Sequence, residues 1–263
     1  MDWNGRRIVI TGASRGIGRS LALNLAGRGG RLVLAARSGA DLEAVAREVR
    51  TRGGEAVAVP TDVAEEGSVR DMVRTAALAL GGIDVLVNNA GVGLRAGVQD
   101  MNPADFTRAL AVNLLGPLHC VQAVLPYLRQ QGGGLVISIS SLAGILPVPF
   151  LGGYSASKHA GIALFRCLRA ELAGRGVRVM LVYPGSVDTD FRRNALGDGY
   201  PDRARASRVS PEQVAEVVAR AAEAERQDVF IRRSDRLLVM VARLAPGLAD
   251  RVLIGRYGKS PRS

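Results

Sequence analysis

Short apolar runs alternate with stretches of helical periodicity along most of the chain. The apolar runs predict strands at 7–10, 32–36, 56–60, 83–87, 135–139, 177–182 and 228–231. Between them, apolar residues recur every three or four positions and predict helices at 17–25, 41–50, 69–80, 105–128, 151–172 and 211–224. Mostly apolar strands that alternate with helices indicate an α/β fold: a doubly wound (Rossmann-type) parallel sheet of about seven strands with helices on both faces.

Residues beyond the last predicted strand exceed what this architecture needs. We therefore predict one domain, 1–233, and a C-terminal helical extension of it, 234–263. One helical face of the extension is apolar and has Arg236 and Arg243 beside it; its members are Leu237, Leu238, Val241, Leu244, Ala245 and Leu248. We favour packing of this stripe on the same chain or on a partner subunit. The alternative is that residues 236–254 lie on a membrane as a basic amphipathic helix.

Composition narrows the classes of function. The 263 residues are 48% hydrophobic, which is enough for the core of one sizeable domain. Two cysteines, Cys120 and Cys167, are too few for a disulfide framework, and the N-terminus runs into the first strand without a visible secretory signal, so we expect a cytoplasmic protein. No uncharged apolar run reaches about 18 residues, so we expect no membrane-spanning segment.

The formal net charge of +11 adds a further constraint. A basic chain can bind nucleic acid, anionic lipid or a phosphorylated ligand. Aromatic residues for base stacking are few, at 4%, and no nucleic-acid-binding module is visible, so we do not expect nucleic acid as a partner. No group of His, Cys and carboxylate residues has the spacing of metal ligands; we predict no catalytic metal and interpret His119 and His159 as structural.

A glycine-rich turn joins the first predicted strand to the first predicted helix. Gly12, Gly16 and Gly18 follow the pattern G-x-x-x-G-x-G in the stretch TGASRGIG. Glycines let a ligand approach the backbone, and the N-terminus of a helix offers free N–H groups and a partial positive charge. The flanking strand and helix favour a phosphate-binding turn over a plain glycine turn.

The end of the second strand points to a particular cofactor. In NAD-specific folds an acidic residue about 20 positions after the first glycine binds the ribose diol. Here that place holds Ala36 and Arg37, and Arg15 lies inside the glycine turn. Two arginines without a carboxylate favour the 2′-phosphate of NADP; the alternative is that Arg37 is only solvated. Asp62, after the third strand, is expected to accept a hydrogen bond from adenine, to cap the next helix, or both.

Tyr154 and Lys158 stand four residues apart, so they share a face of their predicted helix. A free phenol titrates near ~10, and a nearby ammonium lowers its pKa by stabilising the phenolate. Tyr154 would then be a usable general acid or base. A pair with this spacing is more often an ordinary exposed helix face, so the prediction depends on the residues around it.

Further polar residues fall where a ligand of this fold would bind. The glycine turn, Arg37, Asp62 and Asn89 all follow strands, and ligands of doubly wound sheets bind beyond the carboxyl ends of the strands. Ser141 follows the fifth strand. The alternative to a role in ligand binding is that Ser141 only caps a helix. Asn113 lies in the middle of a predicted helix, where it is either a buried amide satisfied by its neighbours or the site of a local opening that holds a water.

Together these motifs resemble those of the short-chain dehydrogenase/reductase family, roughly over residues 5 to 232. The features that carry the resemblance, in order, are TGASRGIG at 11–18, NNAG at 88–91, Asn113, Ser141, Tyr154, Lys158 and PGSVDT at 184–189. The resemblance implies hydride transfer between a nicotinamide cofactor and a carbonyl/alcohol pair, with Asn113, Ser141, Tyr154 and Lys158 as the catalytic set.

The resemblance assigns a role to each member of that set. Tyr154 protonates the carbonyl oxygen as hydride reaches the carbon, and Ser141 orients the same oxygen, so both contact the substrate and stabilise the developing charge. Lys158 holds the nicotinamide ribose and lowers the tyrosine pKa. Asn113 holds a water that links Lys158 to solvent.

The cofactor contacts also follow from the resemblance. They are Gly12, Ser14, Arg15, Gly16, Ile17, Gly18, Arg37, Asp62, Val63, Asn89, Ala90, Gly91, Tyr154, Lys158, Pro184, Gly185, Val187 and Thr189, with the Val187 backbone and Thr189 at the carboxamide and phosphate portions. A preference for NADP favours reduction as the cellular direction. Members of the family are usually dimeric or tetrameric, so we expect a homo-oligomer.

Two segments are expected to line the substrate site. Residues 191–210 have the composition of a mobile lid and carry Arg192, Arg193, Arg203, Arg205 and Arg208. An apolar stretch, Leu146, Val148, Phe150 and Leu151, either walls a site for a hydrophobic ketone or aldehyde or packs against a second subunit. The alternative to an enzyme is a catalytically silent nucleotide-sensing or scaffold protein on the same fold.

Overall fold

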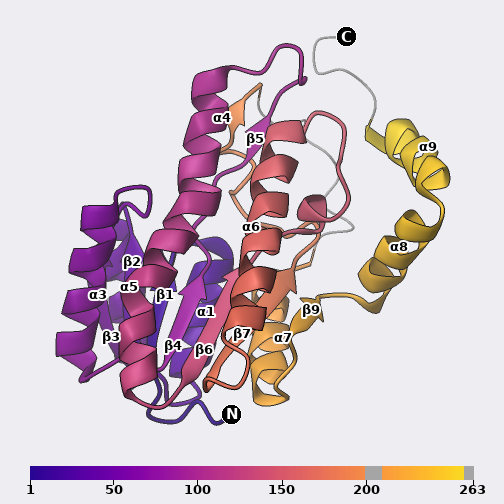
Figure 1. Cartoon of the computed structure of the whole chain (residues 1–263). Coiled ribbons are helices and arrows are strands. Elements are labelled where there is room, and N and C mark those ends of the chain that lie inside the picture. Colours follow the sequence, from indigo (N-terminus) through magenta and orange to yellow (C-terminus); the bar gives the residue numbers. More distant parts are fainter. Residues whose placement is uncertain (199–208, 258–263) are drawn as a thin grey trace.

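A computed structural model describes residues 1–198 and 209–257. In that part of the chain, seven strands form a parallel sheet in the order β3-β2-β1-β4-β6-β7-β9 (Figure 1). The strands are β1 (Arg7–Thr11), β2 (Arg31–Ala36), β3 (Glu55–Pro60), β4 (Val85–Asn88), β6 (Gly134–Ile139), β7 (Val177–Tyr183) and β9 (Asp228–Phe230). The predicted doubly wound sheet is confirmed, and its strand order reverses between β1 and β4, where such sheets bind ligands.

Helices cover both faces of the sheet because successive strand residues point to opposite sides. One face carries α1 (Gly16–Ala26), α2 (Gly39–Thr51) and α7 (Pro211–Glu223); the other carries α3 (Glu66–Leu80), α5 (Gly116–Gln130) and α6 (Gly152–Glu171). Within β1, Ile8 and Ile10 pack in the first core and Val9 in the second. The middle of the sheet is therefore packed with apolar side chains on both faces.

The helix predicted at 105–128 changes from α-helical to π-helical geometry in its middle. The structure has a continuous helical run made of α4 (Pro103–Leu110), the π-helical segment η1 (Ala111–Leu115) and α5. Asn113 is the central residue of η1. A local opening here is one of the two alternatives that the sequence left open, and π-helical segments are frequent at functional sites.

The same run, Pro103–Gln130, is the one helix in the described part of the chain that is long and apolar enough to cross a membrane. Its α5 portion nevertheless packs on the sheet, because Cys120, Val124 and Leu128 are fully buried in the second core. We interpret it as a core helix.

Two very short strands lie outside the main sheet. β5 (Leu94–Arg95) pairs in parallel with β8 (Leu196–Gly197), which joins the segment after β4 to the segment after β7. Pairing of two residues leaves no readable pattern, so the sequence did not predict either strand. The predicted lid is described only up to residue 198 and from 209 onward; Arg203, Arg205 and Arg208 fall outside the described residues.

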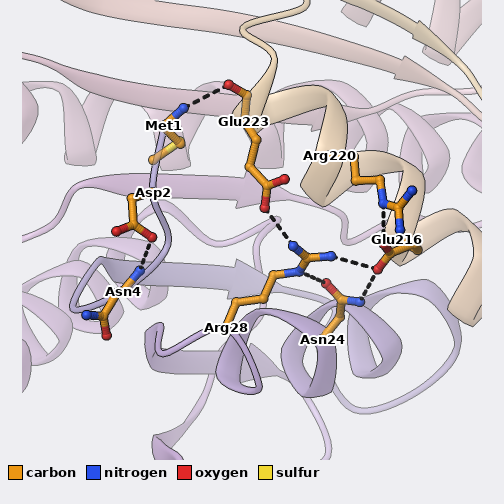
Figure 2. A network of polar contacts seen from close by, with 8 residues as sticks. All are labelled: Met1, Asp2, Asn4, Asn24, Arg28, Glu216, Arg220 and Glu223. Atoms are coloured by element: carbon orange, nitrogen blue, oxygen red, sulfur yellow. Dashed lines mark hydrogen bonds and ion pairs between the residues drawn. The ribbon is translucent and has the colours of Figure 1, made fainter.

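A polar network joins α1 to α7 across the first face of the sheet (Figure 2). Arg28 donates to Asn24 Oδ1 at 3.0 Å, to Glu216 Oε2 at 2.8 Å and to Glu223 Oε1 at 2.7 Å. The N-terminal ammonium of Met1 donates to the Glu223 carbonyl at 2.9 Å. The contacts of Arg28 with the two glutamates and of Met1 with Glu223 connect residues about 190 to 220 positions apart, and they hold the start of the chain on its last core helix.

Two helices form the C-terminal extension, outside the layers that cover the sheet (Figure 1). They are α8 (Arg233–Leu244) and α9 (Pro246–Tyr257). The prediction of one helical face from 237 to 248 is wrong, because Pro246 cannot continue a helix and disfavours helical geometry at Ala245. Packing of the stripe on its own chain is also not found: Leu237 and Leu244 are 62% and 85% exposed.

Candidate active site

Glycines shape the turn between β1 and α1. Gly12 and Gly16 have φ of 65° and 54°, in the left-handed region that favours glycine. A Cβ on Gly18 would lie 2.1 Å from the Gly12 carbonyl oxygen, so no larger residue fits at the start of the helix. Ile17 packs on the first core and anchors the turn. The turn therefore presents bare backbone and the N-terminus of α1, the arrangement that binds phosphate.

Thr11 and Asn89 brace this turn from the neighbouring strand ends. The Thr11 hydroxyl oxygen accepts from the backbone N–H groups of Asn89 and Ala90, both at 3.1 Å. The Asn89 side-chain amide donates to the carbonyls of Thr11 and Gly12, both at 3.0 Å. The amide nitrogen of Asn89 thus positions the glycine turn. Thr11 was missed as a positioning residue, although its place at the end of β1, directly before the first glycine, is a usable signal.

The Asp62 carboxylate is held by two hydrogen bonds. It accepts from the backbone N–H of Ala64 at 3.0 Å and from the Arg108 guanidinium at 2.8 Å. The predicted capping role is wrong, since Glu65 is the N-cap of α3 and Asp62 closes the turn before it. Burial alone would raise the pKa of Asp62, but the hydrogen bonds from Arg108 and Ala64 outweigh it and lower the pKa. Arg108, on α4, is a partner that the sequence did not reveal.

The two histidines contact backbone carbonyls. His119 Nδ1 lies 3.3 Å from the carbonyl oxygen of Val63, and His159 Nδ1 lies 2.9 Å from that of Gly144. Val63 is itself buried against Gly116. These contacts support the structural interpretation of both histidines.

The two arginines predicted to favour NADP are both exposed. Arg15 is exposed as the N-cap of that helix, and Arg37 is exposed after β2. A hollow of about 340 Å³ opens between α1 and α2, lined by Ser14, Arg15, Arg19, Asp41, Ala44, Val45 and Glu48. The Glu48 carboxylate is paired with Arg19 at 2.6 Å, so much of its charge is compensated.

Tyr154 lies in the first turn of α6 with its phenol buried. Burial raises the pKa of Tyr154 to about 12, and a hydrogen bond with the Ser141 hydroxyl opposes part of that rise. The Ser141 hydroxyl oxygen also accepts from the Ala143 N–H at 3.1 Å as the N-cap of the short helix η2 (Leu142–Gly144). Ser141 is therefore both a helix cap and a neighbour of the tyrosine.

The ammonium of Lys158 does not act on Tyr154 as predicted. Lys158 is buried, and its Nζ donates to the Ile139 carbonyl at 3.2 Å. Burial lowers the pKa of Lys158 to about 8. The expected lowering of the Tyr154 pKa by this ammonium is wrong for the chain on its own, because loss of hydration dominates for both groups.

Asn113 links the π-helical segment to the segment that follows β4. Its Oδ1 accepts from the Val92 N–H and its Nδ2 donates to the Val92 carbonyl, both at 2.9 Å. Its Nδ2 also donates to the Ser157 hydroxyl at 3.0 Å. A Cβ on Gly91 would lie 3.2 Å from Asn113 Oδ1 and 3.4 Å from Lys158 Nζ. The buried amide is satisfied by its neighbours and the helix is open there, so both sequence interpretations describe part of the geometry.

The segment after β7 returns to the glycine turn. Pro184 and Gly185 lie against η2: the Leu142 N–H donates to the Pro184 carbonyl at 2.9 Å. A Cβ on Gly16 would lie 3.1 Å from the Thr189 methyl carbon, so these two residues, which are far apart in the sequence, adjoin.

The predicted lid begins directly beside these residues. Val187 forms a backbone bridge with Val209, and Arg192 donates to the Ser186 hydroxyl at 3.0 Å. Arg192 therefore lies against the segment that follows β7, to which it also belongs.

An apolar cluster surrounds Tyr154. Its members come from segments far apart in the sequence and are Val92, Leu94, Met101, Phe106, Ala109, Ala143, Phe191 and Leu196. The Phe191 ring meets the tyrosine ring edge-on, with centroids 5.8 Å apart. The predicted wall at 146–151 makes other contacts: Leu151 bridges Ala96, and Phe150, at φ 63°, lies under the Arg95 guanidinium. Most of the cluster was missed because its residues are scattered in the sequence.

Known proteins resemble this chain over most of its length. A family model described as short chain dehydrogenase matches residues 6–198. The dehydrogenase/reductase SDR family member 7B of Bos taurus is 34% identical over 268 residues, which cover 97% of this chain and 82% of that protein.

Solved structures agree with the sequence relatives. A short chain dehydrogenase/reductase from Burkholderia phymatum in complex with NAD has a TM-score of 0.87 and 28% identity, over 94% of this chain and 96% of that one. A metagenomic short-chain oxidoreductase in complex with NADP has a TM-score of 0.74 and 38% identity, over 86% and 96%. The chain therefore belongs to the short-chain dehydrogenase/reductase family and is an NAD(P)-dependent oxidoreductase.

Proposed function

We propose that this oxidoreductase uses NADPH to reduce a hydrophobic ketone or aldehyde, with Tyr154 as the general acid. The observation that carries the proposal is the buried Tyr154 phenol, hydrogen-bonded to Ser141 and followed one helical turn later by the buried Lys158. A titratable pair in such surroundings, beyond the strand ends of a doubly wound sheet, is a functional-site signature.

The residues around this pair fit a dinucleotide. Gly12, Gly16 and Gly18 leave the turn before α1 without side chains, and a Cβ at Gly18 would collide with the backbone. Gly91 likewise leaves space beside Asn113 Oδ1 and Lys158 Nζ. The glycine turn would hold the pyrophosphate, and Lys158 would hold the nicotinamide ribose. When bound, the reduced nicotinamide supplies the hydride that reaches the carbonyl carbon.

Tyr154 and Ser141 then act on the carbonyl oxygen. Because burial raises the pKa of Tyr154 to about 12, the phenol keeps its proton at neutral pH and is ready as an acid. The developing alkoxide is a much stronger base than a phenolate, so the proton moves from the Tyr154 hydroxyl to the substrate oxygen. The Ser141 hydroxyl is a second donor to that oxygen and stabilises its negative charge.

The apolar cluster around Tyr154 supports a hydrophobic substrate. Leu94 is buried beside the tyrosine, and the partly buried Phe106 and Phe191 complete the apolar surroundings. Apolar walls with a few placed polar groups are typical of small-molecule sites. Here the polar groups are the Tyr154 and Ser141 hydroxyls, which suit one carbonyl oxygen.

Replacing Tyr154 tests the proposed acid. We expect Tyr154→Phe to lower kcat about 10³-fold, because the proton donor is lost, while the dissociation constant for NADPH stays close to that of the parent. NADPH absorbance followed against a graded series of apolar ketones and aldehydes measures the first, and cofactor fluorescence measures the second.

Tyr183→Phe is the matched control. It also removes a buried hydroxyl, which donates to Asp228 at 2.5 Å, and it should keep turnover. Turnover of Tyr154→Phe at the parent rate would rule out this tyrosine as the acid.

The NADP preference has its own test in Arg37. A carboxylate at the end of β2 would hydrogen-bond a ribose diol and repel a 2′-phosphate. We therefore expect Arg37→Asp to weaken NADPH binding at least about tenfold and to leave NADH binding unchanged or tighter, as measured by titration with each cofactor. An equal change for both cofactors would contradict a role of Arg37 in selecting NADP.

A further inference from the structure

The helix α8 has two sides with opposite surroundings. Val239 is 5% exposed, and Asp235, one turn earlier, is partly buried, so this side faces the protein. At 100° per residue, the opposite side carries Leu237, Met240 and Leu244. Their exposed fractions are 62%, 52% and 85%. An apolar stripe on the outer side of a docked helix is the reverse of what a soluble surface helix shows.

Basic residues lie beside the stripe. Five arginines and two aspartates occur between Arg233 and Tyr257. Arg233 and Arg236 are exposed, whereas Asp235 is on the inner side of α8. In α9, Arg251 and Asp250 are both exposed, so the described extension exposes three arginines against one acid beside its apolar stripe. In α9, Ile254 adds a further exposed apolar side chain, at 61%.

The stripe is held in place by the body of the protein. The Asp235 carboxylate lies 3.7 Å from the position that a Cβ on Gly185 would occupy, which sets the first turn of α8 against the strand connection of the candidate active site. From there α8 and α9 extend along the outside of the molecule (Figure 1). The extension is anchored on one side and uncovered on the other.

We propose that α8 and α9 dock this protein on an anionic lipid bilayer. The exposed leucines and methionine enter the boundary between headgroups and acyl chains, and the arginines bind lipid phosphates. The charge of the surface argues for this occupant over a second copy, because two arginine-rich faces of a chain that carries +11 repel each other. The sequence favoured packing of the stripe on the same chain or on a partner subunit. Its exposure argues against the first, and the charge of the surface argues against the second.

Co-sedimentation with vesicles tests the proposal on the full-length chain. The probes are vesicles of phosphatidylcholine alone and of phosphatidylcholine with about 30% phosphatidylglycerol. We expect the parent to pellet with the anionic vesicles and to be released by high salt. Leu237→Asn combined with Leu244→Asn should reduce the bound fraction at least about tenfold, because the apolar contribution to binding is lost.

Leu78→Asn is the matched control, since Leu78 is 80% exposed on α3, far from the extension in sequence and on another element. It should pellet like the parent. NADPH binding by each variant verifies that the fold is intact, independently of turnover.

Two results would overturn the proposal. One is equal pelleting of the parent and the Leu237/Leu244 variant, or no pelleting with anionic vesicles. The other is a parent oligomer in sedimentation equilibrium that the variant dissociates without any change in pelleting, which would assign the stripe to a second copy. Neither result depends on the identity of the substrate, so the proposed reaction stands or fails separately.

Discussion

At the scale of single residues, burial decides the chemistry of the tyrosine–lysine pair. The spacing of four residues between Tyr154 and Lys158 predicts that they share a helix face and that the ammonium lowers the pKa of the phenol. In the fold the Lys158 ammonium donates to the Ile139 carbonyl, and desolvation moves the pKa of Tyr154 up and that of Lys158 down. Each shift favours the neutral form, as expected when a group leaves water without gaining a charged partner.

The lowered pKa of Lys158 makes stability depend on pH. Burial lowers this pKa from 10.5 to about 8, so between those values the unfolded chain binds more protons at Lys158 than the folded chain does. Stability therefore rises with pH in that window, and below it both states are protonated and the full cost of burying the charge remains. Relative to Lys158→Met, the free energy of unfolding of the parent should increase by about 2 kcal/mol from about pH 7.5 to about pH 9.5.

Urea denaturation at the two pH values measures this difference. Lys158→Arg is the control, because a guanidinium stays charged across the range and should give no such increase. Parallel pH dependence of the parent and Lys158→Met would contradict the assignment.

At the scale of elements, local pattern predicts where helices and strands occur but not how they are interrupted. Residues 105–128 read as one helix because apolar spacing continues through Asn113. In the π-helical segment Ala111–Leu115, the Asn113 amide bonds Val92 and Ser157, which are distant in sequence. In the C-terminal extension the break between α8 and α9 has a local cause, Pro246. The sequence contains this signal, but the apolar pattern continues through it and led to the prediction of one helical face.

The shortest elements depend entirely on their partners. β5 and β8 have two residues each and exist because the segments after β4 and β7 meet. Similarly, Asp62 was predicted to cap a helix from its position alone, whereas Arg108 of α4 determines where one of its carboxylate oxygens points. Local sequence carries no record of a partner 46 residues away.

At the scale of the whole molecule, the network between α1 and α7 ties the two ends of the catalytic domain together. Its centre is Glu216, which accepts from Asn24, Arg28 and Arg220 (Figure 2). These hydrogen bonds, with that from Asn24 the largest contribution, lower the pKa of Glu216 to about 2. The carboxylate is partly exposed, so screening by water limits what each contact contributes.

Removing Arg28 tests the network. We expect Arg28→Ala to lower the free energy of unfolding by about 1 kcal/mol at neutral pH, since several partners lose a donor at once. Because the pKa of Glu216 is depressed, its contribution is present above the ordinary carboxyl pKa of 4.5 and is lost as the pH falls toward 2. The difference between parent and variant should shrink over that range in urea titrations.

Arg74→Ala is the comparison variant, because the ion pair of Arg74 with Asp71 is 71% exposed on both sides. It should change stability by less than about 0.5 kcal/mol. If Arg74→Ala lowered the free energy of unfolding as much as Arg28→Ala, the α1–α7 contacts would contribute no more to stability than an exposed ion pair.

The sequence by itself determined the architecture and the chemical inventory of this protein. Apolar strands that alternate with helices allow only a few folds, and the glycine turn, Ser141, Tyr154 and Lys158 are recognisable because their spacing reflects local backbone geometry. Only the tertiary structure decided the surroundings of those residues: the carbonyl that holds Lys158, the apolar cluster on Tyr154 and the uncovered side of α8. The physical reason is that burial and partner choice arise between segments far apart in the chain, whereas sequence patterns record only what neighbours along the backbone require.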